Sequence, residues 1–240
     1  MWSVCKKELR QFFSSLTGYI AIIVFLLING LVLFVFKNNI LENGYATLDD
    51  FFHLAPWILI FLVPAITMRA FADEYRGGTF EVLRTRPLTG WQVVGGKFWG
   101  SFLVALIALL PTLIYYITIN QLAATTGIDA GAAAGAYLGL AFLTAVFTSI
   151  GIYISSVTNN SVVAFIVTTV ALALLYYGFT AISQLAFFQS GADYFIELMG
   201  IESHYRSISR GVLDTRDIIY FVSLLFFFLL LTQQTIRKRA

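Results

Sequence analysis

Charge, cysteine and histidine are all scarce in this chain of 240 residues. Only 12% of the residues are charged and 59% are hydrophobic, a composition outside the range of soluble domains and typical of an integral membrane protein. The single cysteine, Cys5, excludes an internal disulfide and a cysteine-based metal cluster. His53 and His204 lie far apart without ligand spacing around them, so neither predicts a metal site. A net charge of +2 is too small to indicate binding of nucleic acid.

The uncharged hydrophobic runs predict an all-α integral membrane protein with six transmembrane helices. A helix needs about 20 residues to cross the hydrocarbon core. The charge-free segment 130–192 is about three times that length, and the polar run 155–161 is the place where the chain turns back. The expected spans are residues 18–36, 51–72, 98–120, 135–157, 161–183 and 218–236.

Two segments outside the spans are expected at the membrane surface. Residues 1–15 form an amphipathic helix with apolar side chains such as Trp2 on one face and Lys6, Lys7 and Arg10 on the other, which is typical of an interfacial helix. Residues 184–217 are too apolar for a free loop and too charged to span. We expect an extracytoplasmic segment there, with short helices that dip into the interface or return part way.

The stretch 73–97 is the one long polar interruption in the first half of the chain. It carries the charged residues Asp73, Glu74, Arg76, Glu81, Arg84, Arg86 and Lys97. At roughly 3 kcal/mol for each charge at the bilayer centre, burial in lipid would cost on the order of 20 kcal/mol. The stretch is therefore expected outside the membrane, between the second and third spans.

A short capped helix is expected within this stretch. Gly77–Gly78 can end one helix, Thr79 is a suitable N-cap for the next, and Glu81 is favourably placed in its first turn. The helix runs over Phe80–Arg86 and stops before Pro87, because a proline disfavours helical geometry in the residue that precedes it.

This short helix is amphipathic. Phe80 and Leu83 lie one turn apart on one face, with Glu81, Arg84 and Arg86 elsewhere. Two interpretations follow from the residues. One is an ordinary solvated loop with a turn of helix, which periodicity alone favours, and the other is a docking helix for a soluble partner.

The distribution of Lys and Arg predicts which way the chain faces. Eleven of the fifteen lie near the N-terminus, in the stretch 69–97 or at the C-terminus, and four lie on the opposite side. Six spans place both termini on one side, and the positive-inside rule makes that side cytoplasmic. We therefore expect a multi-pass protein of the cytoplasmic (inner) membrane with both termini in the cytoplasm.

The order of residues in the stretch 73–97 resembles the cytoplasmic coupling region of ABC-2 type transporter permeases. The matching residues are Glu74, Gly78, Thr79, Glu81, Leu83, Thr85, Pro87, Gly96 and Lys97. The segment Ser203–Ser223 is similar to the approach to the last span in that family. The stretches Ile28–Phe36 and Ala55–Glu74 most resemble the permease subunit of the transporter associated with gliding motility.

The resemblance implies the six-span fold over the full length and a permease that couples ATP hydrolysis in a separate ABC ATPase subunit to export or conformational work in gliding motility. It implies a second permease subunit, either a copy of this chain or a different one, and contact with membrane lipid. ATP and magnesium belong to the ATPase, and no cofactor to this chain. The implied coupling residues are Glu74, Gly77, Gly78, Thr79, Phe80, Glu81, Leu83, Arg84, Arg86 and Pro87, with the glycines as hinge and Phe80 and Leu83 as apolar anchor.

Groups for catalysis or ion coupling are missing from the expected spans. They hold no acidic or basic residue apart from Arg69 near the end of the second span, whereas ion-coupled carriers and intramembrane enzymes usually need such groups. Gly90–Phe98 resembles a phosphate-binding loop only superficially, because Phe98 stands where Ser or Thr would bind magnesium. We expect no enzymatic activity from this chain. A non-transporting membrane anchor that transmits force in a motility or secretion machine stays an alternative.

Small residues repeat along the start of the fourth span. Gly131, Gly135 and Gly139 recur every four residues, a spacing that lets helix backbones approach closely. We expect helix packing there, either within one subunit or across a dimer seam.

Overall fold

The computed structural model describes residues 1–36, 40–43, 47–84, 89–123, 127–185 and 193–239. Across these ranges the chain forms helices and no strand. Six of the described helices are long and apolar enough to cross a membrane, namely Leu16–Phe34, Asp49–Arg76, Gly90–Leu122, Ala130–Val157, Ser161–Ser183 and Thr215–Lys238. The predicted all-α fold with six spans is confirmed.

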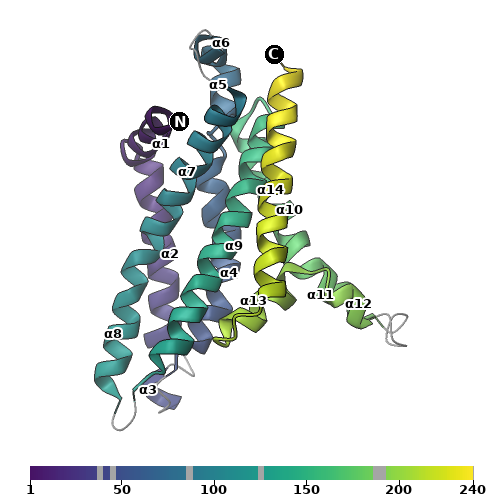
Figure 1. Cartoon of the computed structure of the whole chain (residues 1–240). Helices are drawn as coiled ribbons and strands as arrows, with labels where there is room; N and C mark the ends of the chain where they lie inside the picture. Colours follow the sequence, from purple (N-terminus) through teal and green to yellow (C-terminus); the bar gives the residue numbers. More distant parts are fainter. Residues whose placement is uncertain (37–39, 44–46, 85–88, 124–126, 186–192, 240) are drawn as a thin grey trace.

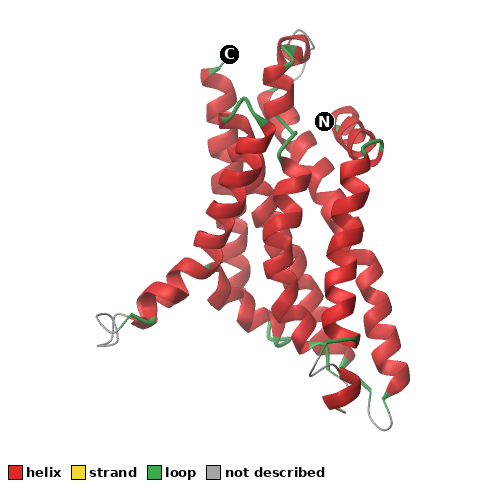
Figure 2. Ribbon diagram, turned by 180° about the vertical axis from the view of Figure 1, so that it is seen from behind, coloured by secondary structure: helices red, strands yellow, loops and turns green. Residues whose placement is uncertain are grey.

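The spans run alternately up and down the bundle. The elements are α1 (Trp2–Phe13), α2 (Leu16–Phe34), α3 (Ile40–Asn43), α4 (Asp49–Thr67), α5 (Ala72–Arg76), α6 (Thr79–Arg84), α7 (Gly90–Leu109), η1 (Leu110–Thr112), α8 (Leu113–Leu122), α9 (Ala130–Val157), α10 (Ser161–Ala173), η2 (Leu174–Gly178), α11 (Phe179–Ser183), α12 (Asp193–Glu197), α13 (Ile201–Ser209) and α14 (Thr215–Lys238). Both termini and α6 lie at one end, which we call the terminal end, and α3, α12 and α13 lie at the opposite end (Figure 1). There α11 and α12 lean outward from the bundle (Figure 2).

The third, fourth and sixth spans begin at least three residues before their predicted starts, because polar side chains cap their first turns. The third begins at residue 90 instead of 98, after a capping box in which Thr89 and Gln92 exchange hydrogen bonds of 3.3 and 3.1 Å. Asp129 and Asp214 accept backbone hydrogen bonds at the starts of α9 and α14, which begin at residues 130 and 215 instead of 135 and 218. The stretch predicted as 73–97 therefore ends at residue 89, and the segment predicted as 184–217 ends at residue 214.

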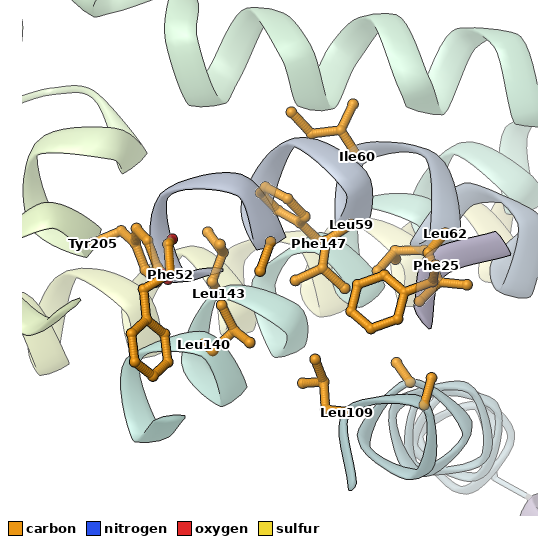
Figure 3. Close-up of a cluster of buried hydrophobic side chains, with 14 of the residues drawn as sticks. Phe25, Phe52, Leu59, Ile60, Leu62, Leu109, Leu140, Leu143, Phe147 and Tyr205 are labelled. Carbon is orange, nitrogen blue, oxygen red and sulfur yellow. The ribbon is translucent and has the colours of Figure 1, made fainter. Parts of the chain in front are cut away.

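The helix α9 is the centre of the bundle. Of its most hydrophobic 18 residues 78% are buried, whereas the corresponding share of α14 is 17%. It packs on α4, α7, α10, α13 and α14. Leu140, Leu143 and Phe147 of α9 point toward Phe52 and Leu59 of α4 (Figure 3). Because lipid tails are as apolar as leucine, close packing of this kind holds membrane helices together.

Two glycines of α9 receive α13 at close range. A Cβ at Gly139 would lie 2.6 Å from Cγ2 of Ile208, and one at Gly135 would lie 3.1 Å from Cα of Gly211. A Cβ at Gly131 would meet only the Asp129 carboxylate, at 3.2 Å. The glycine repeat thus brings α9 against α13 at Gly139 and against the turn that follows α13 at Gly135.

The helix α13 is also joined to the start of α14 through His204. The Nδ1 atom of His204 lies 2.6 Å from Oδ1 of Asp217, and Nε2 lies 2.9 Å from the carbonyl oxygen of Leu198. The imidazole ring stacks on Tyr220 with 3.9 Å between ring centroids. Both ring nitrogens of His204 are therefore occupied, and among the described residues no three His, Cys, Asp or Glu side chains are grouped so that they could hold a metal ion.

Candidate functional site

The second span breaks before it reaches α5, and a serine of α9 holds the break. The Ser155 hydroxyl donates to the carbonyl oxygen of Met68 at 3.1 Å and accepts from the amides of Phe71 and Ala72 at 3.0 and 3.2 Å. Backbone groups at helix ends lack partners within the helix. The Ser155 hydroxyl supplies hydrogen bonds to the Met68 carbonyl and to the Phe71 and Ala72 amides at this break. The junction between α4 and α5 is thereby fixed to α9.

Gly77 and Gly78 form the turn between α5 and α6. Gly78 has a φ of +65°, which favours glycine, whereas Gly77 keeps right-handed geometry and ends α5. Thr79 is the first residue of α6, so the prediction that it is the N-cap is wrong: the left-handed residue before it leads directly into the helix. The Thr79 hydroxyl instead donates to the carbonyl oxygen of Glu74 at 3.5 Å.

Phe80 packs inside the chain. It is 6% exposed, and its ring centroid lies 4.9 Å from that of Tyr75 and 6.2 Å from that of Phe71, both in edge-to-face geometry. The ring therefore anchors α6 to α5. The anchor role toward a partner that the resemblance implied for Phe80 stays a prediction.

The remaining implied coupling residues lie on α6 and beyond it. Glu81 is exposed in the first turn of α6. Leu83 and Arg84 lie in the second turn, where the described helix ends. The predicted helix end at Arg86, together with Pro87, lies outside the described residues.

Lys97 is the centre of a buried ion cluster that joins three helices. Its side chain has no exposure, and its Nζ lies 2.8 Å from Oε1 of Glu8 on α1 and 2.9 Å from Oε1 of Glu74 on α5. It also donates to the carbonyl oxygen of Ala70. Lys7 of α1 reaches the same Glu74 oxygen at 2.6 Å. With Lys7, whose side chain is 47% exposed, two lysines and two carboxylates balance in charge, which offsets the cost of burying Lys97, Glu8 and Glu74.

The positions of Lys97 and Glu74 differ from those expected. Lys97 was predicted in a polar loop, but it lies on α7 with its charge neutralised by helices distant in sequence. Glu74 is 7% exposed and paired on two sides. It therefore connects α5 to the bundle.

The helix α1 lies across the terminal end and packs against α7 (Figure 1). A Cβ at Gly96 would lie 2.7 Å from Cβ of Val4, and one at Gly100 would lie 2.7 Å from Cβ of Glu8. The two glycines let the helices come close enough for Glu8 to reach Lys97.

The buried face of α1 is narrower than the predicted apolar face. Val4 and Cys5 are buried against the bundle, whereas Trp2 is 60% exposed with the ammonium of Lys6 5.7 Å from its ring centre. Burial raises the pKa of the Cys5 thiol above its ordinary value. The predicted division into an apolar and a basic face holds for Cys5 and Lys6 but not for Trp2.

Sequence reasoning missed Lys7, Glu8 and Ser155 as members of this site. One usable signal was present, because Gly96 and Gly100 have the same four-residue spacing as the glycines of the fourth span. Ser155 carried no comparable signal, since it lies in a polar run that reads as a chain reversal although α9 continues through it to Val157.

The six spans and the short helix between the second and third spans are features that the resemblance implied. A family model described as ABC-2 family transporter protein matches residues 2–233. The chain belongs to the ABC-2 transporter family. It is a multi-pass membrane protein with the permease role of that family, whose members are membrane components that generally work with an ABC ATPase. No curated protein matches this ABC-2 permease.

Proposed function

We infer that this ABC-2 permease couples ATP hydrolysis in a separate ATPase subunit to export or conformational work across the membrane. The observation that carries the proposal is the attachment of α5. Glu74 pairs with Lys97 of α7 and Lys7 of α1, and Ser155 of α9 holds the backbone where α5 begins. A force applied to α6 therefore acts on three other helices at once.

The contact with the ATPase is placed on α6 and its turn. Glu81 is the exposed carboxylate of that helix, and Gly77–Gly78 allows α6 to tilt relative to α5. Breaking a buried ion pair by removing one partner costs about 3–5 kcal/mol, so the cluster resists separation of α5 from α7. The expected mechanism is a concerted movement of α1, α5 and α7 when the ATPase moves α6.

The terminal end is proposed to face the cytoplasm. It carries the exposed cations of the N-terminal helix, Lys6 and Arg10, and those at the end of the last span, Arg237 and Lys238. The positive-inside rule favours this orientation in the cytoplasmic membrane. α12 and α13 then lie on the extracytoplasmic side.

ATP and magnesium are proposed to bind the ATPase and not this chain. Residues 90–97, which resemble a phosphate-binding loop in sequence, form the first turns of α7, and Lys97 is engaged by carboxylates. A second permease subunit, either a copy or a different chain, completes the proposed transporter within the lipid. The resemblance of Ile28–Phe36 and Ala55–Glu74 supports a role in gliding motility.

Co-purification from the native membrane tests the proposal. The native permease is expected to bring an ATPase subunit with it, and Glu81→Arg is expected to lose that subunit because it reverses an exposed charge on α6. Asp50→Arg is the matched control, since Asp50 is also an exposed acid in the first turn of a helix but lies at the opposite end. Absence of an ATPase from the native preparation, or equal retention by both variants, refutes the coupling assignment.

A further inference from the structure

Arg239 lies where three elements of the terminal end meet. Its Nη1 donates to Oδ1 of Asn159 at 2.7 Å, and its Nη2 donates to the carbonyl oxygen of Val157. The guanidinium carbon lies 4.5 Å from the centre of the Tyr75 ring. One side chain at the end of α14 thus contacts the turn between α9 and α10 and the middle of α5.

Arg239 is held at the end of α9 by neutral oxygen acceptors and not by a carboxylate. The structure records no ion pair for Arg239 among the described residues. Val157 is the last residue of α9, and its carbonyl has no partner within the helix. The negative end of the helix dipole favours a cation at this point, and the fork of the guanidinium suits two separate acceptors and a ring face.

Tyr75 passes this contact on to α6. Its ring stacks on Phe71 at 6.0 Å and meets Phe80 of α6 edge to face at 4.9 Å. The Tyr75 hydroxyl is buried and has no hydrogen-bond partner in the part of the chain that the structure describes, so the ring is the part of the side chain that interacts. The order of contacts is α6, Tyr75, Arg239, and then the ends of α9, α10 and α14.

We propose that Arg239 is a positioning residue of the coupling region, which ties α6 to the last three spans through the face of the Tyr75 ring. This inference rests on the proposed function. The Lys97 cluster joins α5 to α1 and α7, and Ser155 joins the start of α5 to α9. Arg239 adds the contact of α5 with α14 and with the turn between α9 and α10. Loss of Arg239 therefore weakens the transmission from α5 to α10 and α14, while the Lys97 cluster still transmits to α1 and α7.

Distances between spin labels in the assembled permease–ATPase complex test the inference. Trp99 of α7, Val163 of α10 and Ile20 of α2 are exposed on the outside of the bundle and take labels in a Cys5→Ala background. Trapping with magnesium, ADP and vanadate is expected to change both the Trp99–Val163 and the Trp99–Ile20 distances. In Arg239→Ala the first change falls by about half or more and the second is retained.

Three further variants separate positioning from a general structural effect. Tyr75→Leu is expected to reduce both distance changes, because it removes the ring that contacts Phe80 of α6 as well as Arg239. Tyr75→Phe is expected to behave as the native protein, because the ring face is kept and the hydroxyl has no partner among the described residues. Lys238→Ala is the matched control, since it removes the neighbouring exposed cation and no contact of the Tyr75 ring.

The inference is overturned if Arg239→Ala leaves both distance changes intact, if it abolishes both, or if Tyr75→Phe behaves like Tyr75→Leu. The proposed function is scored separately by co-purification of the ATPase with the native permease. Absence of the ATPase from the native preparation refutes both the coupling assignment and the inference. If the ATPase co-purifies but the Trp99–Val163 distance changes as much in Arg239→Ala as in the native protein, only the inference is refuted.

Discussion

Replacement of Lys97 by methionine removes the charge at the centre of the buried cluster while keeping most of the side-chain volume. Among the described residues Glu8 then loses the one cation with which it forms an ion pair, whereas Glu74 keeps Lys7 at 2.6 Å. Methionine also leaves the carbonyl oxygen of Ala70 without its donor. The variant therefore leaves the Glu8 carboxylate of α1 without a counter-ion.

The expected loss of stability follows from burial. The Lys97 side chain is fully buried and that of Glu8 is 11% exposed, so the usual cost of about 3–5 kcal/mol for removing one partner of a buried pair applies. We take the lower end, about 3 kcal/mol, because Glu74 remains paired. For a chain of this size that corresponds to a melting temperature about 6–12 °C lower.

A second substitution separates the ion pair from the packing. Glu8→Gln in the Lys97→Met background removes the orphaned charge and is expected to recover about 1–2 kcal/mol, although Glu8→Gln alone destabilises the native protein. Lys238→Met is the control for loss of an exposed cation. Thermal unfolding in one detergent compares the native protein with the four variants.

Two results would refute this reasoning. One is a loss below about 1 kcal/mol in Lys97→Met, which would mean that the cluster is solvated or dispensable. The other is simple addition of the two single losses in the double variant, which would mean that Lys97 and Glu8 do not interact.

Three further predictions concern the same bundle. Cys5 is buried and its thiol pKa is raised. We expect it to resist alkylation at pH 7–8 in the native protein and to react fully in denaturant, which mass spectrometry measures. Rapid alkylation of the native protein would contradict the packing of α1. Gly139→Ala is expected to destabilise by about 1–3 kcal/mol because its Cβ would meet Ile208 at 2.6 Å, whereas Gly131→Ala should be nearly neutral; equal melting temperatures would contradict the close approach. Gly78→Ala should cost about 1–2 kcal/mol because φ is +65°, and unchanged melting and ATPase retention would show that the turn tolerates a side chain.

The number of spans could be predicted from sequence because each helix satisfies its own backbone in lipid. The hydropathy of each segment therefore predicts a span without reference to the rest of the chain, and the uncharged runs predicted six helices. The break at Gly77–Gly78 was predictable for the same reason, since adjacent glycines act on backbone geometry without help from distant residues.

The ends of the helices were less predictable. Charge and polarity marked residues 90–97 and 215–217 as loop, but Thr89 and Asp214 cap helices that contain them. A capping side chain and a loop side chain are of the same chemical kind. Hydrophobicity alone therefore placed these boundaries inside the spans.

By itself the sequence determined the helical class, the count of spans and the side shared by the two termini, because these depend on the length, polarity and order of local segments. Only the tertiary structure decided that Lys97 is a buried hub, that Phe80 faces inward, and that Ser155 and Arg239 hold α5. The partners of Lys97 lie as far as 89 residues away in the chain. A lysine in a polar stretch reads as solvated until packing brings those carboxylates to it, since burial and pairing are properties of the whole bundle and not of any one segment.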